Sequence, residues 1–511
     1  MKRSLIASSI LLLLWLVPGL SAQVFIGGKS FIGGKAFIGA STAVPTPTFV
    51  QGVSTSNSEG ATYVDTCFYF NLPMPAQSGN TIVIEGTAAA DVTLTVTDNE
   101  GDSYTTTNYY QSITNFGQSF FIARSIGVTA GAQYLTACIS AESYFVEFAA
   151  QEYANVTAFD VASVGNGAAS GTAVTAGSGT STANGDLVVA ATYSFNENSL
   201  TKATTIVPGT NSGITWSLAD ENLDGFGVMY GVQTSSGALN PAITLGTSNP
   251  WVALAIFLKA GSSGSIPTGF RIIHLEHENL SGGGAAGPAV SYPLTMQFAC
   301  SGNLLVGMWA GTGSQYPTGY TDSNSNTWAQ AGSTYVSTGS DQVMAFYGTK
   351  SGGASCSNNM TLTMSVTGSA QPATLLLYDV AGAATSSVLD TTAGGVGNNS
   401  TYGNGTINTD SSSSSSGGCT TCQTLTPATA NELILTVMAW DYNTATNVSP
   451  GLYDMNTFSG MASSGPNQAI DENNGWGHYF DPNTSTISGV TWTQGNAFAS
   501  DTWACIMVAL K

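Results

Sequence analysis

Short runs in which apolar and polar residues alternate dominate the chain. Such runs are typical of half-buried β-strands, and Gly, Asn, Asp and Ser separate them as turn residues. No segment shows a sustained helical period of apolar residues. The pattern predicts an all-β protein, with strands at residues 81–87, 91–98, 144–150, 187–194, 361–366 and 374–380.

The pattern also occurs twice. WVALAIFLK at Trp251–Lys259 recurs as WACIMVALK at Trp503–Lys511, and VTDNEGDSY at 96–104 recurs as YTDSNSNTW at 320–328. The copies lie roughly 220–250 residues apart, which predicts an internal duplication of one folding unit. About a dozen short strands per unit favour two tandem antiparallel two-sheet β-sandwiches of jelly-roll-like type. The two apolar nonamers have no polar face, so we expect each to be a central strand of its sheet.

Changes in composition mark the boundaries between segments. Lys2-Arg3, an apolar run and small residues up to Ala22 are typical of a secretory signal peptide. A Gly/Ser stretch at 260–268 follows the first closing strand and predicts a linker. The expected organisation is a signal peptide (1–22), a leader with a Pro-rich end (23–48), unit one (49–259), the linker (260–268), and unit two (269–511) with a Ser-rich CxxC insertion at 398–422.

The leader has a short repeat of its own, which reads IGGKSF, IGGKAF and IGASTA from Ile26. This spacing resembles the hexapeptide repeat of left-handed parallel β-helices, although one coil cannot bury its own core. Two interpretations stay open: a flexible apolar leader, or a strand that docks on this chain or on a neighbouring molecule.

Over residues 49–511 the strand pattern and the duplication resemble the tandem β-sandwich proteins that bacteria secrete or display. The resemblance implies an extracellular or cell-surface location and rests on no catalytic motif. It therefore implies a class of architecture rather than an activity.

The charge balance limits the partners. Charged residues make up 8% of the chain, and 10 Lys and Arg face 30 Asp and Glu, for a net charge of −20. Such a surface repels phosphate backbones, so we expect no nucleic-acid partner. After the signal peptide no apolar stretch reaches the roughly 18 residues of a membrane helix, so we expect no transmembrane segment in the mature chain.

Seven cysteines in an exported chain predict disulfides and leave at least one thiol over. Cys67 and Cys138 lie on polar strand faces, which suits a cross-strand bridge. Cys300 with Cys356 is the corresponding pair in unit two, and Cys419 with Cys422 predicts a local bridge within CTTC. Cys505 lies in the apolar closing strand and is expected to be a buried, inert thiol.

Two constellations offer binding chemistry. The turn residues Asp98, Asn99, Glu100 and Asp102 are candidate calcium ligands, with an ordinary hairpin turn as the alternative. In unit two, aromatic residues cluster in the sequence with Asp and Asn, a combination that sugar sites use; core filling is the alternative. The candidate sugar-binding residues are Trp440, Tyr442, Tyr453, Trp476 and Tyr479.

No catalytic spacing is present: the chain lacks HExxH, a nucleophile elbow and a serine-triad arrangement. We therefore expect a non-catalytic extracellular protein with a structural, adhesive or assembly role, and no cofactor unless calcium binds. Self-association, or contact with matrix or glycans, is the expected kind of partnership. Carbohydrate binding by unit two is the first alternative function, and a glycan-active enzyme is the second.

Overall fold

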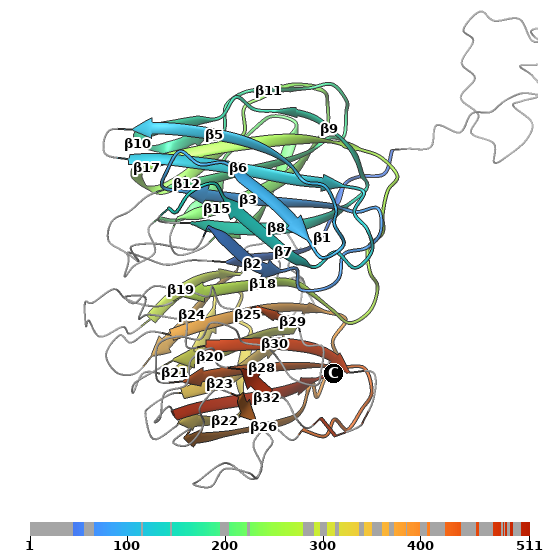
Figure 1. Cartoon of the computed structure of the whole chain (residues 1–511), viewed down its shortest axis with the longest axis vertical. Coiled ribbons are helices and arrows are strands. Elements are labelled where there is room, and N and C mark those ends of the chain that lie inside the picture. Colours follow the sequence, from blue (N-terminus) through green and yellow to red (C-terminus); the bar gives the residue numbers. More distant parts are fainter. Residues whose placement is uncertain are drawn as a thin grey trace, which may run out of the picture. The chain divides into compact units, whose positions relative to one another are not determined.

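All the regular elements that the structure describes are strands, which confirms the all-β prediction. Residues Pro45–Lys511 form one compact unit, and in the described part of the chain no helix is long and apolar enough to cross a bilayer. The computed structural model (Figure 1) describes residues 44–55, 66–113, 116–143, 146–194, 204–221, 225–279, 291–296, 304–311, 316–336, 342–349, 360–366, 373–384, 386–398, 406–408, 425–440, 456–458, 474–481, 484, 486–487, 491–493 and 502–511.

A ten-stranded sheet contains strands from both sequence copies (Figure 1). Its neighbours pair in antiparallel fashion except β1 and β18, which pair in parallel with Val53 beside Leu275. The expectation of antiparallel pairing is wrong at this one contact, because the opening strands of the two copies meet edge to edge and run in the same direction. In spatial order the strands are β22 (Thr327–Val336), β23 (Gln342–Thr349), β20 (Leu304–Gly311), β25 (Ala373–Ala381), β18 (Arg271–Asn279), β1 (Thr48–Thr55), β8 (Glu147–Ala154), β3 (Thr81–Ala88), β6 (Phe116–Ile126) and β5 (Thr105–Ile113).

Smaller sheets accompany it. Two three-stranded sheets consist of β2 (Cys67–Asn71), β7 (Tyr134–Ile139) and β4 (Leu94–Asp98), and of β19 (Ser291–Met296), β24 (Met360–Val366) and β21 (Pro317–Asp322). A seven-stranded sheet has the order β10 (Asn166–Thr175), β17 (Ala242–Ala260), β12 (Leu187–Ser194), β15 (Phe226–Gln233) and β14 (Ile214–Glu221), with β9 (Val156–Ala162) and β13 (Ile206–Pro208) also paired to β17. A five-stranded sheet has the order β26 (Leu389–Asn398), β32 (Thr502–Leu510), β28 (Glu432–Trp440), β30 (Asn474–Asp481) and β29 (Asn456–Phe458). The two-stranded sheets are β11 (Gly179–Ser181) with β16 (Gly237–Leu239), and β27 (Thr406–Asn408) with β31 (Thr491–Thr493).

One strand order recurs in these sheets. Strands β1 to β8 give the order first, eighth, third, sixth, fifth in the large sheet, and their second, seventh and fourth strands form a separate sheet. Strands β18 to β25 repeat both orders. Strands β10 to β17 repeat the five-strand order, and β9 and β10, which both pair with β17, together form the opening strand. The described strands of β26 to β32 fit the same order with no fourth strand. We refer to β1–β8, β9–β17, β18–β25 and β26–β32 as the first, second, third and fourth repeats.

Two local features mark the same positions in the repeats. In three repeats a residue with positive φ stands two residues before the point where the third strand begins to pair with the eighth: Gly79 (81°), Gly185 (84°) and Asn431 (62°). Gly and Asn suit this left-handed conformation, since a Cβ is otherwise strained there. The pairing of the opening strand with the eighth strand also has a β-bulge in every repeat, and the skipped residues are Val50, Asp160, Ile273 and Asp390.

One half of the ten-stranded sheet comes from the first repeat and the other half from the third. The sheets that cover its two faces are exchanged between these halves. Val53 and Leu275 are neighbours on one face. On that face one hydrophobic cluster joins the first half to the sheet β2-β7-β4 and the second half to the sheet of β28 and β32. On the other face a cluster joins the first half to β12, β15 and β17, and another joins the second half to β24.

Three expectations from the sequence are confirmed. Strand β17 lies between β10 and β12, and β32 lies between β26 and β28, so both closing strands are central, and Ile256 and Ile506 are fully buried. Cys67 and Cys138 are register partners and form a disulfide. Cys505 is buried in β32. Residues 1–43, Cys300, Cys356, Cys419 and Cys422 lie outside the described residues.

Candidate functional site

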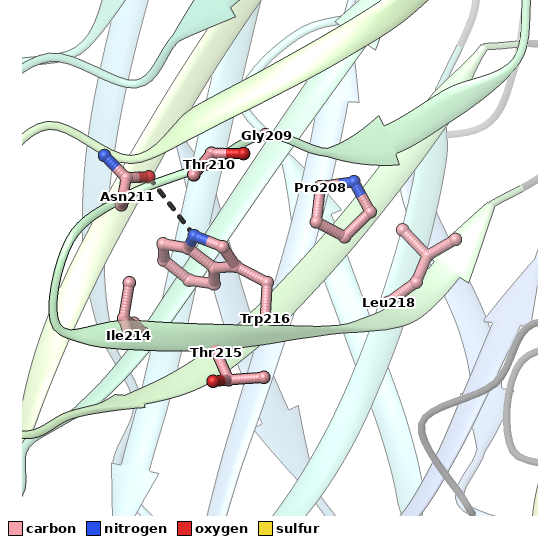
Figure 2. Close-up of a pocket in the computed structure, with 8 residues that line it drawn as sticks. All are labelled: Pro208, Gly209, Thr210, Asn211, Ile214, Thr215, Trp216 and Leu218. Atoms are coloured by element: carbon pink, nitrogen blue, oxygen red, sulfur yellow. Dashed lines mark hydrogen bonds between the residues drawn. The ribbon is translucent and has the colours of Figure 1, made fainter.

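A groove of about 400 Å³ lies beside Trp216 in the described part of the chain (Figure 2). Strand β14 supplies one wall with Ile214, Thr215, Trp216 and Leu218, and the end of β13 with the following turn supplies the other. The indole of Trp216 is half-buried and lies between that turn and β14 in Figure 2. A second hollow of about 430 Å³ shares Ile214 and Thr215 and extends to Tyr230.

A hydrogen bond to Asn211 fixes the edge of the Trp216 ring (Figure 2). Its Nε1–H donates to Asn211 Oδ1 at 3.2 Å, and the same oxygen accepts the Ala242 amide at 2.9 Å. Asn211 Nδ2 donates to the Asn240 carbonyl at 2.8 Å. The Asn211 side chain is thus committed to the fold, so a ligand would find an aromatic surface together with the exposed Thr210 and Thr215. Aromatic surface with nearby hydroxyls suits a sugar ring better than a charged ligand.

The same anchoring occurs in two other repeats. Tyr104 OH donates to Asp98 Oδ2 at 2.9 Å, and Trp328 Nε1–H donates to Asp322 Oδ2 at 2.5 Å. In each case an acidic or amide side chain in the turn before the fifth strand holds the tip of an aromatic ring. This contact explains physically why VTDNEGDSY and YTDSNSNTW are alike.

The predicted calcium turn is satisfied by donors of its own chain. Asp98 Oδ1 accepts the amides of Glu100 (3.0 Å) and Asp102 (3.1 Å). Both oxygens of Asp102 accept bonds from Thr129, and Asn99 Oδ1 accepts the amides at Gln133 and Tyr134. The geometry is that of a turn closed by Asx bonds. The hairpin alternative is wrong, because β4 pairs with β7 and β5 pairs with β6, so the turn links two different sheets. Within the described ranges no group of three His, Cys, Asp or Glu side chains is placed to hold a metal ion.

The structure places two members of the predicted aromatic group of unit two, Trp476 and Tyr479, on opposite faces of β30. Trp476 is 2% exposed and belongs to the cluster between the five-stranded sheet and the ten-stranded sheet. Tyr479 lies on the other face of β30, partly buried against Ile434 and Met507. Trp440 ends β28, and Tyr442 and Tyr453 lie outside the described residues. A ring as buried as Trp476 cannot stack on a sugar in this conformation.

Sequence reasoning missed a set of buried acids. Asp220 and Glu221 end strand β14 and are 0% and 2% exposed. Burial raises the pKa of Asp220 to about 8, against a weaker opposing contact with Ser54, and burial likewise raises the pKa of Glu85 well above its usual range. Strand alternation could not have placed Asp220, because a β-bulge at Ala219 shifts the pairing of β14 with β15 just before it. Since water and substrate have no access to Asp220, it is a structural group rather than a catalytic one.

No protein-family model, curated protein or solved structure matches this chain. The function must therefore be argued from the geometry alone.

Proposed function

We propose that the chain is a secreted, non-catalytic protein with a structural or assembly role outside the cell. One observation carries the proposal: β1 and β18 pair over Gly52–Thr55, which makes the two sequence copies parts of one sheet. A shared sheet resists bending between the copies, which a framework protein requires. Two domains joined by a flexible linker would not resist it. Asp220, the acid whose pKa is raised to about 8, is fully buried and cannot contact a substrate, which also supports a protein without catalysis.

The finer description of the fold belongs to the same proposal. The strands β2, β7 and β4 share a hydrophobic cluster with β3, β6 and β8, so each eight-strand set is interpreted as a jelly-roll-like β-sandwich. On this interpretation the two sequence units are each a pair of such sandwiches, and the chain arose by duplication.

Assembly is tested with two versions of the mature chain, residues 23–511 and residues 42–511, which lacks the apolar leader. Sedimentation velocity and electron microscopy should show ordered higher-order species for the longer chain and monomers for the shorter one. Equal assembly by both versions would remove the leader from the proposal. Monomers alone at every concentration, in both versions, would contradict the assembly role itself.

Carbohydrate binding is the second candidate function, and the Trp216 groove favours it. The experiment is a glycan array probed with the parent chain, with Trp216→Ala, and with Trp328→Ala as a matched control. Trp328 is also half-buried, but it packs against Phe346 and Tyr320. Hits that Trp216→Ala removes and Trp328→Ala keeps would support a sugar site, whereas a blank array for the parent chain would exclude it.

A further inference from the structure

The lysines of this chain are rare, and the two in the described ranges occupy equivalent positions. Lys and Arg together number ten in 511 residues. Lys259 follows Leu258, the partner of Leu187 at the start of the third strand of the second repeat. Lys511 follows Leu510, the partner of Leu433 at the start of the third strand of the fourth repeat. Both therefore end the eighth strand of their repeat.

Each lysine contacts the bulge aspartate of its own repeat. Lys259 Nζ lies 3.3 Å from Asp160 Oδ1, and Lys511 Nζ lies 2.6 Å from Asp390 Oδ1. The side chains of Asp160 and Asp390 are only 3% and 4% exposed, whereas the lysines are 38% and 28% exposed. The amides of Thr182 and Ala428 hold the far oxygens, Oδ2, of the two aspartates at 2.5 Å. Each carboxylate is therefore immobilised with its carbon beside an amine.

A second, fully buried acid completes each group. Asp186 and Glu432 both follow a residue with positive φ and are 0% exposed. Burial, together with the neighbouring Asp160, raises the pKa of Asp186 to about 7. Asp160 is also buried, but bonds from Thr182, Asp186 and Lys259 outweigh that and lower its pKa to about 2. The pKa of Glu432 is raised by burial, and that of Asp390 is lowered by bonds from Ala428 and Lys511.

The other two repeats provide an internal comparison. The second and fourth repeats have Asp at the bulge, Lys at the end of the eighth strand and a second acid before the third strand. The first and third repeats have an aliphatic residue, Ala and Asn. The residues are Val50, Ala154 and Asn80 in the first repeat and Ile273, Ala381 and Asn303 in the third. The three charged positions thus change together, as members of one functional group would.

We propose that Lys259 and Lys511 are joined to Asp160 and Asp390 by amide cross-links, with Asp186 and Glu432 as the proton-transfer groups. Lysine amines are established nucleophiles, and a buried acid beside the reacting carboxyl can act as general acid and base. Because the amine and the carboxyl are held in contact, the reaction needs no bimolecular encounter. Such an arrangement corresponds to an effective molarity on the order of 10⁵ M or more.

The step balances without any co-reactant. The reactive form is the minor tautomer of each pair, in which the ammonium proton has passed to the facing carboxylate against its lowered pKa. This form has a neutral amine and a neutral carboxylic acid, with no change in total charge. The amine lone pair then attacks Cγ, and a C–N bond forms while one C–O bond breaks. Asp186 or Glu432 gives its proton to the departing oxygen and takes one from the nitrogen. The products are a neutral amide and one water.

The cross-link would tie the opening strand of a repeat to its closing strand. In both repeats the bond joins the bulge of the first strand to the end of the central eighth strand, which prevents these two strands from peeling apart. This inference goes beyond the proposed assembly role and does not depend on it, because a monomeric chain would carry the same bonds.

Mass spectrometry of the intact secreted chain tests the proposal, after its N-terminus is sequenced and its disulfides are reduced. The expected mass is below the sequence mass by about 18 Da per cross-link, or about 36 Da in all, since each bond releases one water. Peptic digestion should give branched peptides that link residue 259 to 160 and residue 511 to 390.

Substitutions assign the bonds to the two groups. Asp186→Asn and Glu432→Gln should each restore one water of mass and free the corresponding lysine. The control Glu85→Gln changes a buried acid outside the two groups, since both lysines of the described ranges contact other acids, and it should keep the full deficit. An unsubstituted chain with its full sequence mass, and with Lys259 and Lys511 in unbranched peptides, would overturn the proposal whether or not the variants fold.

Discussion

Replacement of Asp220 by Asn should remove a large loss of unfolding free energy that the parent chain undergoes at alkaline pH. Asp220 is fully buried, and its pKa rises from an ordinary 3.8 to about 8. A carboxyl whose folded-state pKa is raised favours the folded state below its unfolded pKa, and this contribution is lost as the pH rises through the folded pKa. Four pKa units correspond to about 5 kcal/mol of unfolding free energy lost between pH 4 and pH 8.

Asn is nearly isosteric with the protonated carboxyl and does not ionise. The difference in stability between Asp220→Asn and the parent should therefore be small at pH 4 and should grow to about 5 kcal/mol in favour of the variant at pH 9. Thermal and denaturant melts at several pH values measure that difference. Asp91→Asn, at an exposed turn, is the matched control and should follow the parent at every pH. If the parent and Asp220→Asn instead lost stability in parallel up to pH 9, the reasoning about burial would be refuted.

Three further predictions concern other parts of the fold. Ile256→Asp places an unpaired charge in a central strand and should cost more than about 4 kcal/mol in melts, whereas Ile256→Val should cost about 1 kcal/mol. Removal of the Cys67–Cys138 disulfide, which spans 71 residues, should cost about 4 kcal/mol of unfolding free energy because the unfolded chain regains loop entropy. EDTA should leave the melting temperature unchanged, because Asp98 and Asp102 accept hydrogen bonds from their own chain; a drop that Ca²⁺ restores would contradict this. Asp98→Ala should lower the unfolding free energy by about 2 kcal/mol, because the donors of this turn lose their acceptors.

Features set by local alternation could be predicted from the sequence. The two-sided apolar pattern of Trp251–Lys259 placed this strand centrally in a sheet, and the structure confirms it. The polar strand faces of Cys67 and Cys138 favoured a cross-strand bridge, and the structure has this disulfide. Both inferences need only the period of two residues that a strand imposes.

Features set by long-range pairing could not be predicted. Nothing local in β1 or β18 indicates that they meet in parallel, since their register comes from the packing of whole sheets. Closeness in sequence also misled: Trp476 and Tyr479 are three residues apart, which puts them on opposite faces of β30. The acid and lysine groups escaped notice because their members come together only through a bulge, a strand end and a turn distant in sequence.

The parallel contact between β1 and β18 has an evolutionary consequence. These strands are equivalent, they meet side by side, and the sheets that cover the two halves exchange faces across them. That geometry approximates an isologous interface about a two-fold axis along the strands, with a shift of one residue, because Val53 pairs with Leu275 but is equivalent to Glu276. The duplicated chain thus holds within one polypeptide a contact close to the one that a homodimer of single copies would make. Fusion of the copies makes this contact independent of concentration, and it leaves neither opening strand with a free edge to recruit a stray molecule.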